Sequence, residues 1–477
     1  MKDCCNGGDD RKAAFDLIVV GAGSAGFSAA ITAAEAGKRV ALVGHGTIGG
    51  TCVNVGCVPS KAMIRAAEAV HAAQAAGRFP GIAPCTHAVD WPAVVAGTQA
   101  LVAEMRGRKY ADLLPQYDTV TYVEEGPARL VEGGVEVGGR RLKADRIVIA
   151  TGSRPLMPDI PGIDGVEVLD STGLLFLPEA PESLIVLGGG YVGCELAQMA
   201  ARLGARVTLV TRSRLLPGAE PEVAGALTEA LRAEGIGIET GLRYRQVAAR
   251  DGGVALTIER SGRAETLTAA RLVASTGRVA NTDGLGLAAL GIETDARGSI
   301  RVGPDMATTR PGVYAAGDVT DRDQFVYMAA HGARIAVMNA LGLAPMTYDN
   351  ATMPWVVFTD PQVAGVGLSE AQARAAGHAV KVSVLSLDNV PRALAARDTR
   401  GLIKLVADAG TDRLLGGQIV APEGADTIQT LAMALKMGMT AQALGETIFP
   451  YLTTVEGLKL TAQTFDKDVA RLSCCAG

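Results

Sequence analysis

The sequence has few aromatic residues and no long apolar segment. Aromatic side chains make up 4% of its 477 residues, whereas hydrophobic residues as a whole make up 48% and glycine occurs 59 times. No stretch reaches the roughly 18 uninterrupted apolar residues that a membrane-spanning helix needs. The first residues, MKDCCNGGDDRK, also lack the apolar core of a secretory signal. We therefore expect a cytoplasmic protein of the Ala-, Val- and Gly-rich α/β type.

An excess of basic residues is absent as well. The formal net charge is −5, which argues against nucleic acid as the main partner. The chain contains 8 cysteines. Because cytoplasmic reductants keep ordinary disulfides open, these thiols fit catalytic, metal-binding or buried positions better than a structural disulfide framework.

Two segments follow the order strand, glycine turn, helix, strand. The first covers residues 15–43 and the second residues 184–210. Each turn has the GxGxxG spacing, which lets the backbone turn tightly and brings a pyrophosphate to the start of the helix. The glycines are Gly21, Gly23 and Gly26 in the first turn and Gly188, Gly190 and Gly193 in the second. The chain is therefore predicted to contain two Rossmann-like dinucleotide-binding domains.

The residues after each second strand suggest which dinucleotide binds. Arg212 and Arg214 follow the strand at 207–210. An arginine there suits the 2′-phosphate of NADP, whereas NAD sites usually have an acid. This favours NADPH at the second turn. Two electron carriers in one chain suggest a relay from nicotinamide to flavin, so we expect FAD at the first turn.

The first dinucleotide segment departs from this pattern at one position. Gly44, followed by His45, stands where an acid should hold the adenosine ribose. Either another group makes that contact or water alone holds the ribose. We expect FAD to be retained weakly, in which case Gly44→Glu should tighten its binding.

A pair of cysteines lies in the segment GGTCVNVGCVPSKAM, residues 49–63. Cys52 and Cys57 are five positions apart at the start of a helix, whose positive dipole end favours the thiolate. The pair is not expected to be half of a zinc site, because the sequence has no further zinc ligands nearby. The segment resembles the active-site signature of the pyridine nucleotide–disulfide oxidoreductases, the family of glutathione reductase and dihydrolipoamide dehydrogenase.

The resemblance implies roles for individual residues. Cys57 would lie against the flavin as the charge-transfer thiolate, and Cys52 would be the exposed interchange thiol. Lys61 and Glu195 would form an ion pair near the reactive flavin nitrogen. Tyr191 would gate the nicotinamide pocket, although a plain packing role stays equally open. The segment TRPGVYAAGDV, residues 309–319, resembles the second FAD motif of the family. Further cofactor contacts implied by the family are Gly50, Thr51, Lys61, Thr151, Gly152 and Asp318 for FAD, and Gly277 for NADPH.

The same resemblance implies a glutathione-reductase-like division of the chain into two Rossmann-like domains and a C-terminal α+β dimerisation domain. The expected parts are a FAD-binding domain with the cysteine pair at 1–152, an NADPH-binding domain at 153–277, a central FAD-binding segment at 278–346 and the dimerisation domain at 347–477. Residues 60–112 look largely helical, and 117–150 look like short strands.

The segment FPYLTTVEGLKL, residues 449–460, bears on the substrate. Disulfide-reducing members have a histidine here, with a glutamate five residues later, as the acid–base group for a departing thiol. In this chain Tyr451 takes the histidine's place and Glu456 keeps its spacing. A tyrosine serves proton transfer near neutral pH poorly, so an organic disulfide is not the expected substrate. Half-buried packing is the alternative role for Tyr451.

The last residues, LSCCAG, place Cys474 and Cys475 next to each other. Paired thiolates select soft metal ions. Together with FTDPQVA at 358–364, these features resemble the mercuric reductases within the family. That resemblance implies a homodimer in which the tail of one subunit takes Hg(II) from thiol complexes and passes it to Cys52 and Cys57 of the other. Reduction to Hg(0) would then confer mercury resistance.

Many mercuric reductases have a separate metal-binding domain ahead of the core, and we do not expect one here. Metal capture would rely on the tail or on Cys4 and Cys5, whose role is open. Cys85 and Cys194 are expected to be small buried residues. Two other functions stay open: a thioredoxin-reductase-like disulfide reductase, against which the missing histidine counts, and a non-catalytic thiol metal buffer.

Overall fold

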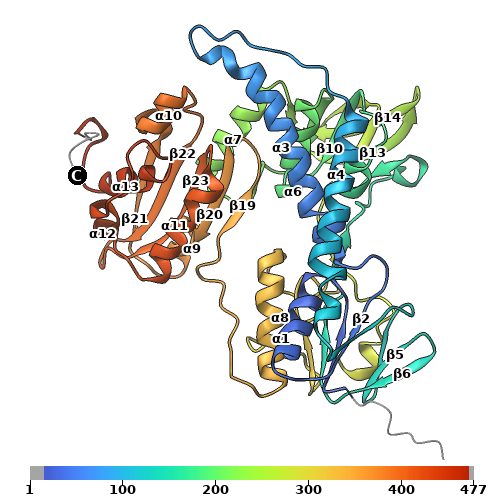
Figure 1. Cartoon of the computed structure of the whole chain (residues 1–477). Helices are drawn as coiled ribbons and strands as arrows, with labels where there is room; N and C mark the ends of the chain where they lie inside the picture. Colours follow the sequence, from blue (N-terminus) through green and yellow to red (C-terminus); the bar gives the residue numbers. More distant parts are fainter. Residues whose placement is uncertain (1–14, 472–477) are drawn as a thin grey trace, which may run out of the picture. The chain divides into compact units, whose positions relative to one another are not determined.

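A computed structural model describes residues 15–471 of the chain (Figure 1). It divides into two compact units, each built from three chain segments. Unit 1 comprises the described residues up to Pro59, with Gly97–Pro155 and Arg278–Asp349. Unit 2 comprises Ser60–Ala96, Leu156–Gly277 and the described residues from Asn350 onward. The predicted α/β class is confirmed.

Unit 1 is built on a parallel five-stranded sheet in the order β18-β7-β1-β2-β3. Its strands are apolar and mostly buried, as a sheet covered on both faces requires. Their bounds are β1 Leu17–Val20, β2 Val40–Val43, β3 Val120–Val123, β7 Ile147–Ile149 and β18 Val313–Ala315. Helix α1 (Ser24–Glu35) packs against α8 (Val326–Ala340), and the Ser28 hydroxyl donates to the Ala330 carbonyl at 2.9 Å.

Smaller β elements complete unit 1. Strands β4 (Arg129–Val131), β5 (Gly134–Val137) and β6 (Arg140–Lys143) form an antiparallel sheet. Strands β8 (Ser153–Pro155) and β17 (Arg278–Ala280) pair antiparallel. The predicted short strands between 117 and 150 are confirmed.

Unit 2 contains a second parallel sheet, in the order β12-β11-β10-β16-β9. Its strands are β9 Val168–Leu169, β10 Ser183–Leu187, β11 Arg206–Val210, β12 Gly237–Glu239 and β16 Arg271–Ala274. Three helices contact this sheet: α5 (Ser171–Leu175), α6 (Tyr191–Arg202) and α7 (Pro221–Ala233). A buried apolar cluster joins it to the antiparallel strands β13 (Arg243–Arg250), β14 (Gly253–Arg260) and β15 (Arg263–Ala269).

A third sheet, also in unit 2, is antiparallel with the order β19-β20-β23-β22-β21. The strands are β19 Trp355–Val357, β20 Gln362–Gly367, β21 Val380–Ser386, β22 Leu402–Asp408 and β23 Leu414–Ala421. Helices α11 (Gly424–Lys436) and α13 (Glu456–Gln463) pack on it. Shorter helices are α9 (Glu370–Ala375), α10 (Pro391–Ala396) and α12 (Ala441–Glu446). This is the expected α+β arrangement of the C-terminal part.

The segment predicted to be largely helical, residues 60–112, contains most of α3 (Cys57–Gln74) and all of α4 (Trp91–Arg106). The short helix α2 (Gly50–Asn54) precedes it. The start of α4 is anchored inside unit 2, where the Trp91 indole is 2% exposed and donates to the Leu177 carbonyl at 2.9 Å. Among residues 15–471, no helix combines the length and apolar character that crossing a membrane requires.

Candidate functional site

The first glycine turn accepts only glycine at two of its positions. Gly21 has φ +117°, and a Cβ there would lie 2.2 Å from the Ala150 carbonyl oxygen. A Cβ on Gly26 would lie 1.7 Å from the Gly21 carbonyl oxygen. Helix α1 begins after Gly23, and no described side chain caps it. Its first backbone N–H groups therefore suit a pyrophosphate, so the turn fits a dinucleotide.

The segment that leads to the cysteines lies directly on this turn. Gly50 has φ +65°, and a Cβ on it would be 2.6 Å from the Gly23 Cα. The Gly49 N–H donates to the Ala22 carbonyl at 2.9 Å. Thr51 follows and is exposed. The structure thus brings Gly50 next to the first glycine turn, and Thr51 is its neighbour in the chain.

The two cysteines lie on consecutive helices rather than at the start of a single one. Cys52 is half-buried within α2, and Cys57 is exposed as the first residue of α3. Cys57 is the first residue of α3, so the positive end of the dipole of this 18-residue helix lies at Cys57. A positive helix end favours the thiolate over the thiol.

Tyr110 was not among the predicted site residues, and it lies close to this pair. Its hydroxyl is 3.4 Å from the Ser24 hydroxyl, and its ring packs edge-on against Phe27 with the centroids 4.8 Å apart. Burial raises the pKa of Tyr110, and negative charge on Cys52 or Cys57 raises it further. The phenol therefore stays neutral beside the thiols. No motif marks this residue, which lies in the short π-helical segment Gly107–Ala111 after α4.

Asn54 and Arg106 were also missed, and they hold the cysteine segment in place. The Asn54 amide donates to the Ile48 and Gly50 carbonyls at 2.9 and 2.8 Å. Its own oxygen accepts from the Arg106 guanidinium at 3.2 Å. These bonds link α4 to α2, the helix that carries Cys52.

The predicted FAD contacts Thr151, Gly152 and Asp318 lie at one edge of the unit 1 sheet. They follow β7 and β18, which run parallel to β1, so these residues and the first glycine turn share the carboxyl edge. The Asp318 carboxylate accepts from the Ser153 hydroxyl at 2.8 Å, and the Thr151 hydroxyl donates to the Asn281 carbonyl at 2.8 Å. Ligands of α/β sheets bind at such an edge.

Lys61 and Glu195 lie together in unit 2, as expected. The Lys61 ammonium is 2.6 Å from the Glu195 carboxylate, which also accepts from the Phe358 N–H at 2.9 Å. The ammonium lies 4.8 Å from the centre of the Phe358 ring. The role of the pair at the flavin stays a prediction.

The second glycine turn repeats the geometry of the first. Gly188 has φ +108°, and its Cβ would lie 2.4 Å from the Ser275 carbonyl oxygen. A Cβ on Gly193 would lie 1.9 Å from the Gly188 carbonyl oxygen. Gly190 precedes α6 and faces open space, as does Gly277 beyond β16. This turn fits a second dinucleotide.

The two predicted 2′-phosphate ligands differ in their surroundings. Arg214 donates to the carbonyls of Leu216, Pro217 and Ala219 at 3.4, 2.9 and 2.6 Å. Arg212 is exposed, and no hydrogen bond from its side chain is found within residues 15–471. Arg212 is therefore the better candidate for a phosphate.

Tyr191 is the first residue of α6, beside the second glycine turn. Its ring stacks on Trp355 with the centroids 5.5 Å apart, and burial raises its pKa to about 12. Three residues later, Cys194 is completely buried, as predicted, and burial raises the pKa of its thiol. The prediction that Cys85 is buried is wrong, because it is exposed in a stretch without helix or strand.

Tyr451 is 54% exposed just before α13. Glu456, the first residue of that helix, is buried and accepts from the Leu452 N–H at 3.2 Å. Cys474 and Cys475, like Cys4 and Cys5, lie outside the described residues. Within 15–471 no three His, Cys, Asp or Glu side chains gather as metal ligands would.

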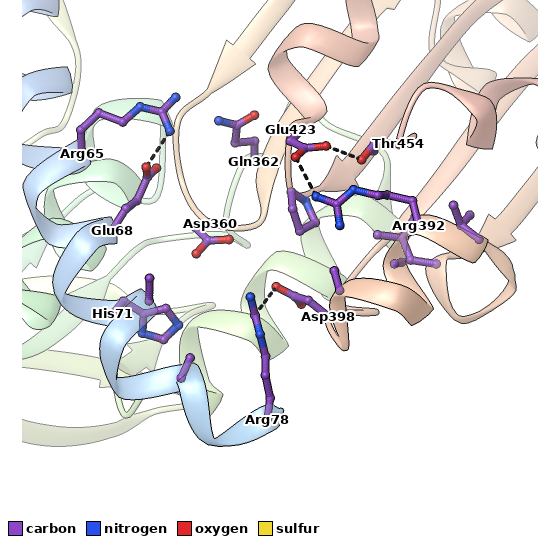
Figure 2. Close-up of a pocket in the computed structure, with 17 residues that line it drawn as sticks. Arg65, Glu68, His71, Arg78, Asp360, Gln362, Arg392, Asp398, Glu423 and Thr454 are labelled. Carbon is purple, nitrogen blue, oxygen red and sulfur yellow. Dashed lines mark hydrogen bonds and ion pairs between the residues drawn. The ribbon is translucent and has the colours of Figure 1, made fainter. Parts of the chain in front are cut away.

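A pocket of about 300 Å³ in unit 2 is separate from all predicted site residues. Its lining includes α3 and the segments around 360, 390 and 423 (Figure 2). Three arginines line it, and each has a carboxylate partner: Arg65 with Glu68, Arg78 with Asp398 and Arg392 with Glu423, at 2.6, 3.2 and 3.1 Å. Because its cations are already paired, the pocket is a poor anion site.

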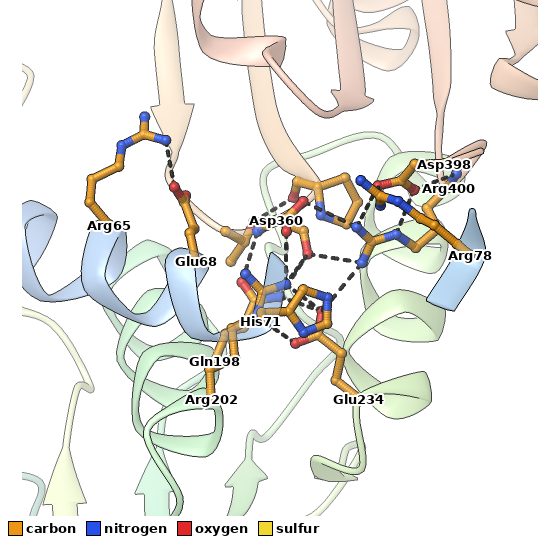
Figure 3. Close-up of polar contacts among 12 residues, drawn as sticks. Arg65, Glu68, His71, Arg78, Gln198, Arg202, Glu234, Asp360, Asp398 and Arg400 are labelled. Carbon is orange, nitrogen blue, oxygen red and sulfur yellow. Dashed lines mark hydrogen bonds and ion pairs between the residues drawn. The ribbon is translucent and has the colours of Figure 1, made fainter. Parts of the chain in front are cut away.

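Charged side chains form a network beside this pocket (Figure 3). The Arg202 side chain is 4% exposed and lies 2.6 Å from Glu234 and 2.9 Å from Asp360. Arg400 contacts the same two acids at 3.3 and 3.2 Å. Burial, followed by the charge of Arg202, lowers the pKa of His71. The network joins α6 and α7 to the start of the antiparallel sheet, so its role is structural.

Comparison with known proteins agrees with this arrangement. The family model described as pyridine nucleotide-disulphide oxidoreductase matches residues 15–336, and the dimerisation domain of that family matches residues 353–462. A mercuric reductase of Streptomyces lividans is 46% identical over 97% of this chain and 98% of that protein. One of Staphylococcus aureus is 43% identical over 98% of this chain and 85% of that protein.

Solved structures resemble nearly the whole chain. The Cu(II) complex of the HOCl-induced flavoprotein disulfide reductase RclA from Escherichia coli has a TM-score of 0.85 at 28% identity, covering 95% of this chain and 99% of that one. LpdA from Mycobacterium tuberculosis has a TM-score of 0.83 at 27% identity, covering 94% and 100%. With both glycine turns and the cysteine segment inside the matched residues, the chain belongs to the pyridine nucleotide-disulphide oxidoreductase family, whose enzymes use a flavin and a pyridine nucleotide.

Proposed function

We propose that this chain is a mercuric reductase, which converts Hg(II) to Hg(0) with two electrons that come from NADPH. The observation that carries the proposal is the near full-length similarity to proteins of that name, from 41% to 46% identical. The cysteine segment lying on the first glycine turn supports it, because a thiol pair there would be next to a dinucleotide bound at that turn.

FAD fits the first glycine turn, and NADPH fits the second. A bound flavin would supply two-electron transfer between the nicotinamide and the cysteine pair. The protein's part is to hold Hg(II) between the Cys52 and Cys57 thiolates, which are soft ligands for a soft metal. The N-terminus of α3 favours the thiolate form of Cys57, and the neutral phenol of Tyr110 adds no competing charge. When the metal is reduced, both thiolates are released.

Arg212 would bind the 2′-phosphate that distinguishes NADPH from NADH. Losing one hydrogen bond to a charged group should raise the KM for NADPH at least about tenfold in Arg212→Ala. The KM for NADH should not change. Arg206→Ala is the matched control, because Arg206 is exposed on β11 and pairs with Glu182 at 2.9 Å. An equal effect on both nucleotides would count against Arg212.

A homodimer is part of the proposal. Exposed apolar side chains gather between 433 and 452, within the residues that match the family's dimerisation domain: Met433, Met437, Ile448, Tyr451 and Leu452, from 44% to 95% exposed. Such a surface suits an interface between subunits. Cys474 and Cys475 of one subunit would then deliver Hg(II) past Tyr451 to the cysteine pair of the other. The four-part domain division and the cytoplasmic location stay predictions.

An anaerobic assay tests the function. NADPH oxidation is followed with Hg(II) in excess thiol, and in parallel with glutathione disulfide and lipoamide. Turnover should depend on mercury and stop in Cys52→Ala/Cys57→Ala, whereas Cys85→Ala, which removes another exposed thiol, should behave as wild type. Turnover with a disulfide but not with Hg(II) would instead support a disulfide reductase.

The tail is tested separately with Cys474→Ala/Cys475→Ala. This variant should slow turnover of Hg(II) bound to bulky thiols, while NADPH should still reduce the flavin at the wild-type rate. Unchanged turnover with bulky complexes would contradict delivery by the tail.

A further inference from the structure

Gly44, at the carboxyl end of β2, is buried by the side chain of a neighbouring strand. Strand β3 pairs with β2 so that Tyr122 lies opposite Leu42, and the Gly44 N–H donates to the Val123 carbonyl at 2.9 Å. A Cβ on Gly44 would lie 2.3 Å from the Tyr122 hydroxyl oxygen and 2.7 Å from its ring. The phenol therefore occupies the space from which a side chain at position 44 would extend.

Within residues 15–471 the Tyr122 hydroxyl has no hydrogen-bond partner. It is buried and finds no hydrogen-bond partner among the residues that the structure describes, a condition shared only with the Arg322 Nε in that part of the chain. Buried polar groups without a partner are rare and costly, and they point to a water or a ligand. Burial, with the nearby charge of Glu124, raises the pKa of Tyr122, so its hydroxyl is neutral and can both donate and accept.

The position of this hydroxyl indicates which ligand it meets. Strands β1, β2 and β3 run parallel, so the end of β2 lies at the same edge as the first glycine turn. In dinucleotide-binding sheets, an acid at the end of the second strand binds the adenosine ribose hydroxyls. Gly44 has no side chain for that task, and Tyr122 fills the place beside it.

We propose that the Tyr122 hydroxyl binds the adenosine ribose of the dinucleotide held at the first glycine turn, in place of the usual acid. The inference rests on the proposed binding of FAD at that turn. It reverses the expectation for Gly44→Glu: a side chain at 44 collides with the phenol, so this substitution alone weakens FAD binding. The ribose is held by another group, which was one of the two alternatives left by the sequence.

The first experiment adds FAD to the apoprotein and measures the dissociation constant of the complex by flavin fluorescence. Tyr122→Phe keeps the ring and removes only the hydroxyl, so FAD should bind about three- to tenfold more weakly. Tyr117→Phe, just before β3, is the matched control and should bind as wild type. An FAD analogue without the 2′- and 3′-hydroxyls on its adenosine ribose should bind wild type and Tyr122→Phe equally.

The second experiment exchanges the two side chains. Gly44→Glu alone and Tyr122→Val alone should each weaken FAD binding. The double variant Gly44→Glu/Tyr122→Val has room for the carboxylate and should recover most of the wild-type affinity. Thermal unfolding of each apoprotein shows whether the variants fold.

The outcomes separate this inference from the proposed function. Wild type that binds no FAD would overturn the flavoprotein assignment itself. If wild type binds FAD and Tyr122→Phe binds it equally well, the inference is wrong. It is also wrong if Tyr122→Phe weakens FAD and the analogue by the same factor, since water would then satisfy the hydroxyl. Weakening by Glu124→Gln and not by Tyr122→Phe would assign the ribose to Glu124.

Discussion

Lys61→Met should destabilise the protein more than Glu195→Gln, because the two partners of this ion pair differ in burial. The Glu195 side chain is 7% exposed, whereas that of Lys61 is 33% exposed. Removing the lysine leaves a buried carboxylate without its cation. Removing the charge on Glu195 leaves an ammonium that can turn toward water.

The contacts set the size of each effect. Breaking a buried ion pair costs about 3–5 kcal/mol, and the Phe358 N–H that Glu195 keeps at 2.9 Å places Lys61→Met near the lower end, at about 3 kcal/mol. Loss of the ammonium–ring contact with Phe358 contributes about 0.5–1 kcal/mol of that. Glu195→Gln still accepts from Phe358, so it loses one charged hydrogen bond, about 1.5 kcal/mol.

Urea unfolding at one protein concentration with saturating FAD measures both values, and the double variant gives the coupling energy. Lys467→Met is the control, because Lys467 is exposed. If Glu195→Gln costs as much as Lys61→Met, burial does not govern this pair and the reasoning is refuted.

Three further predictions concern pH, a buried cation and the first turn. Because burial lowers the pKa of His71 below its usual value, stability is present above about pH 6.5 and is lost as the pH falls through the folded pKa. The Tm of His71→Gln should therefore drop less than that of wild type between about pH 7.5 and about pH 5.5, and equal drops would contradict this. The Lys404 side chain is 2% exposed among three carboxylates, so Lys404→Met should lose about 3–5 kcal/mol in urea unfolding, and a loss near zero would show that the acids find other partners. Gly26→Ala places a Cβ 1.7 Å from the Gly21 carbonyl oxygen, so the purified protein should lack flavin absorbance, whereas Gly97→Ala in open space should keep it.

The local patterns of this chain predicted its fold class and its two strand–turn–helix–strand segments correctly. Both glycine turns, the apolar strands on either side of them and the α/β class follow from contiguous residues, because turn geometry and strand burial depend on neighbours in the sequence. The cysteine segment was recognised for the same reason, since the spacing of Cys52 and Cys57 is contained in one short stretch of sequence.

Contacts between distant segments could not be predicted in this way. Nothing near Tyr110 in the sequence indicates that it lies beside the cysteines. The residues around Cys85 likewise do not indicate whether its side chain is buried or exposed. Arg212 and Arg214 are equally good phosphate ligands by sequence position. Only the folded loop shows that the Arg214 guanidinium already donates to three backbone carbonyls. The charged network around Arg202 likewise joins side chains that only folding brings together.

Gly44 separates what the sequence determines from what only the tertiary structure determines. The sequence by itself determined that no acid follows β2, because that depends on one residue after one strand. Only the pairing of β2 with β3 decided that the Tyr122 phenol fills the vacant place, since the register between parallel strands is set by the packing of the whole sheet. A side chain from the neighbouring strand can therefore replace a missing ligand without leaving any motif in the sequence.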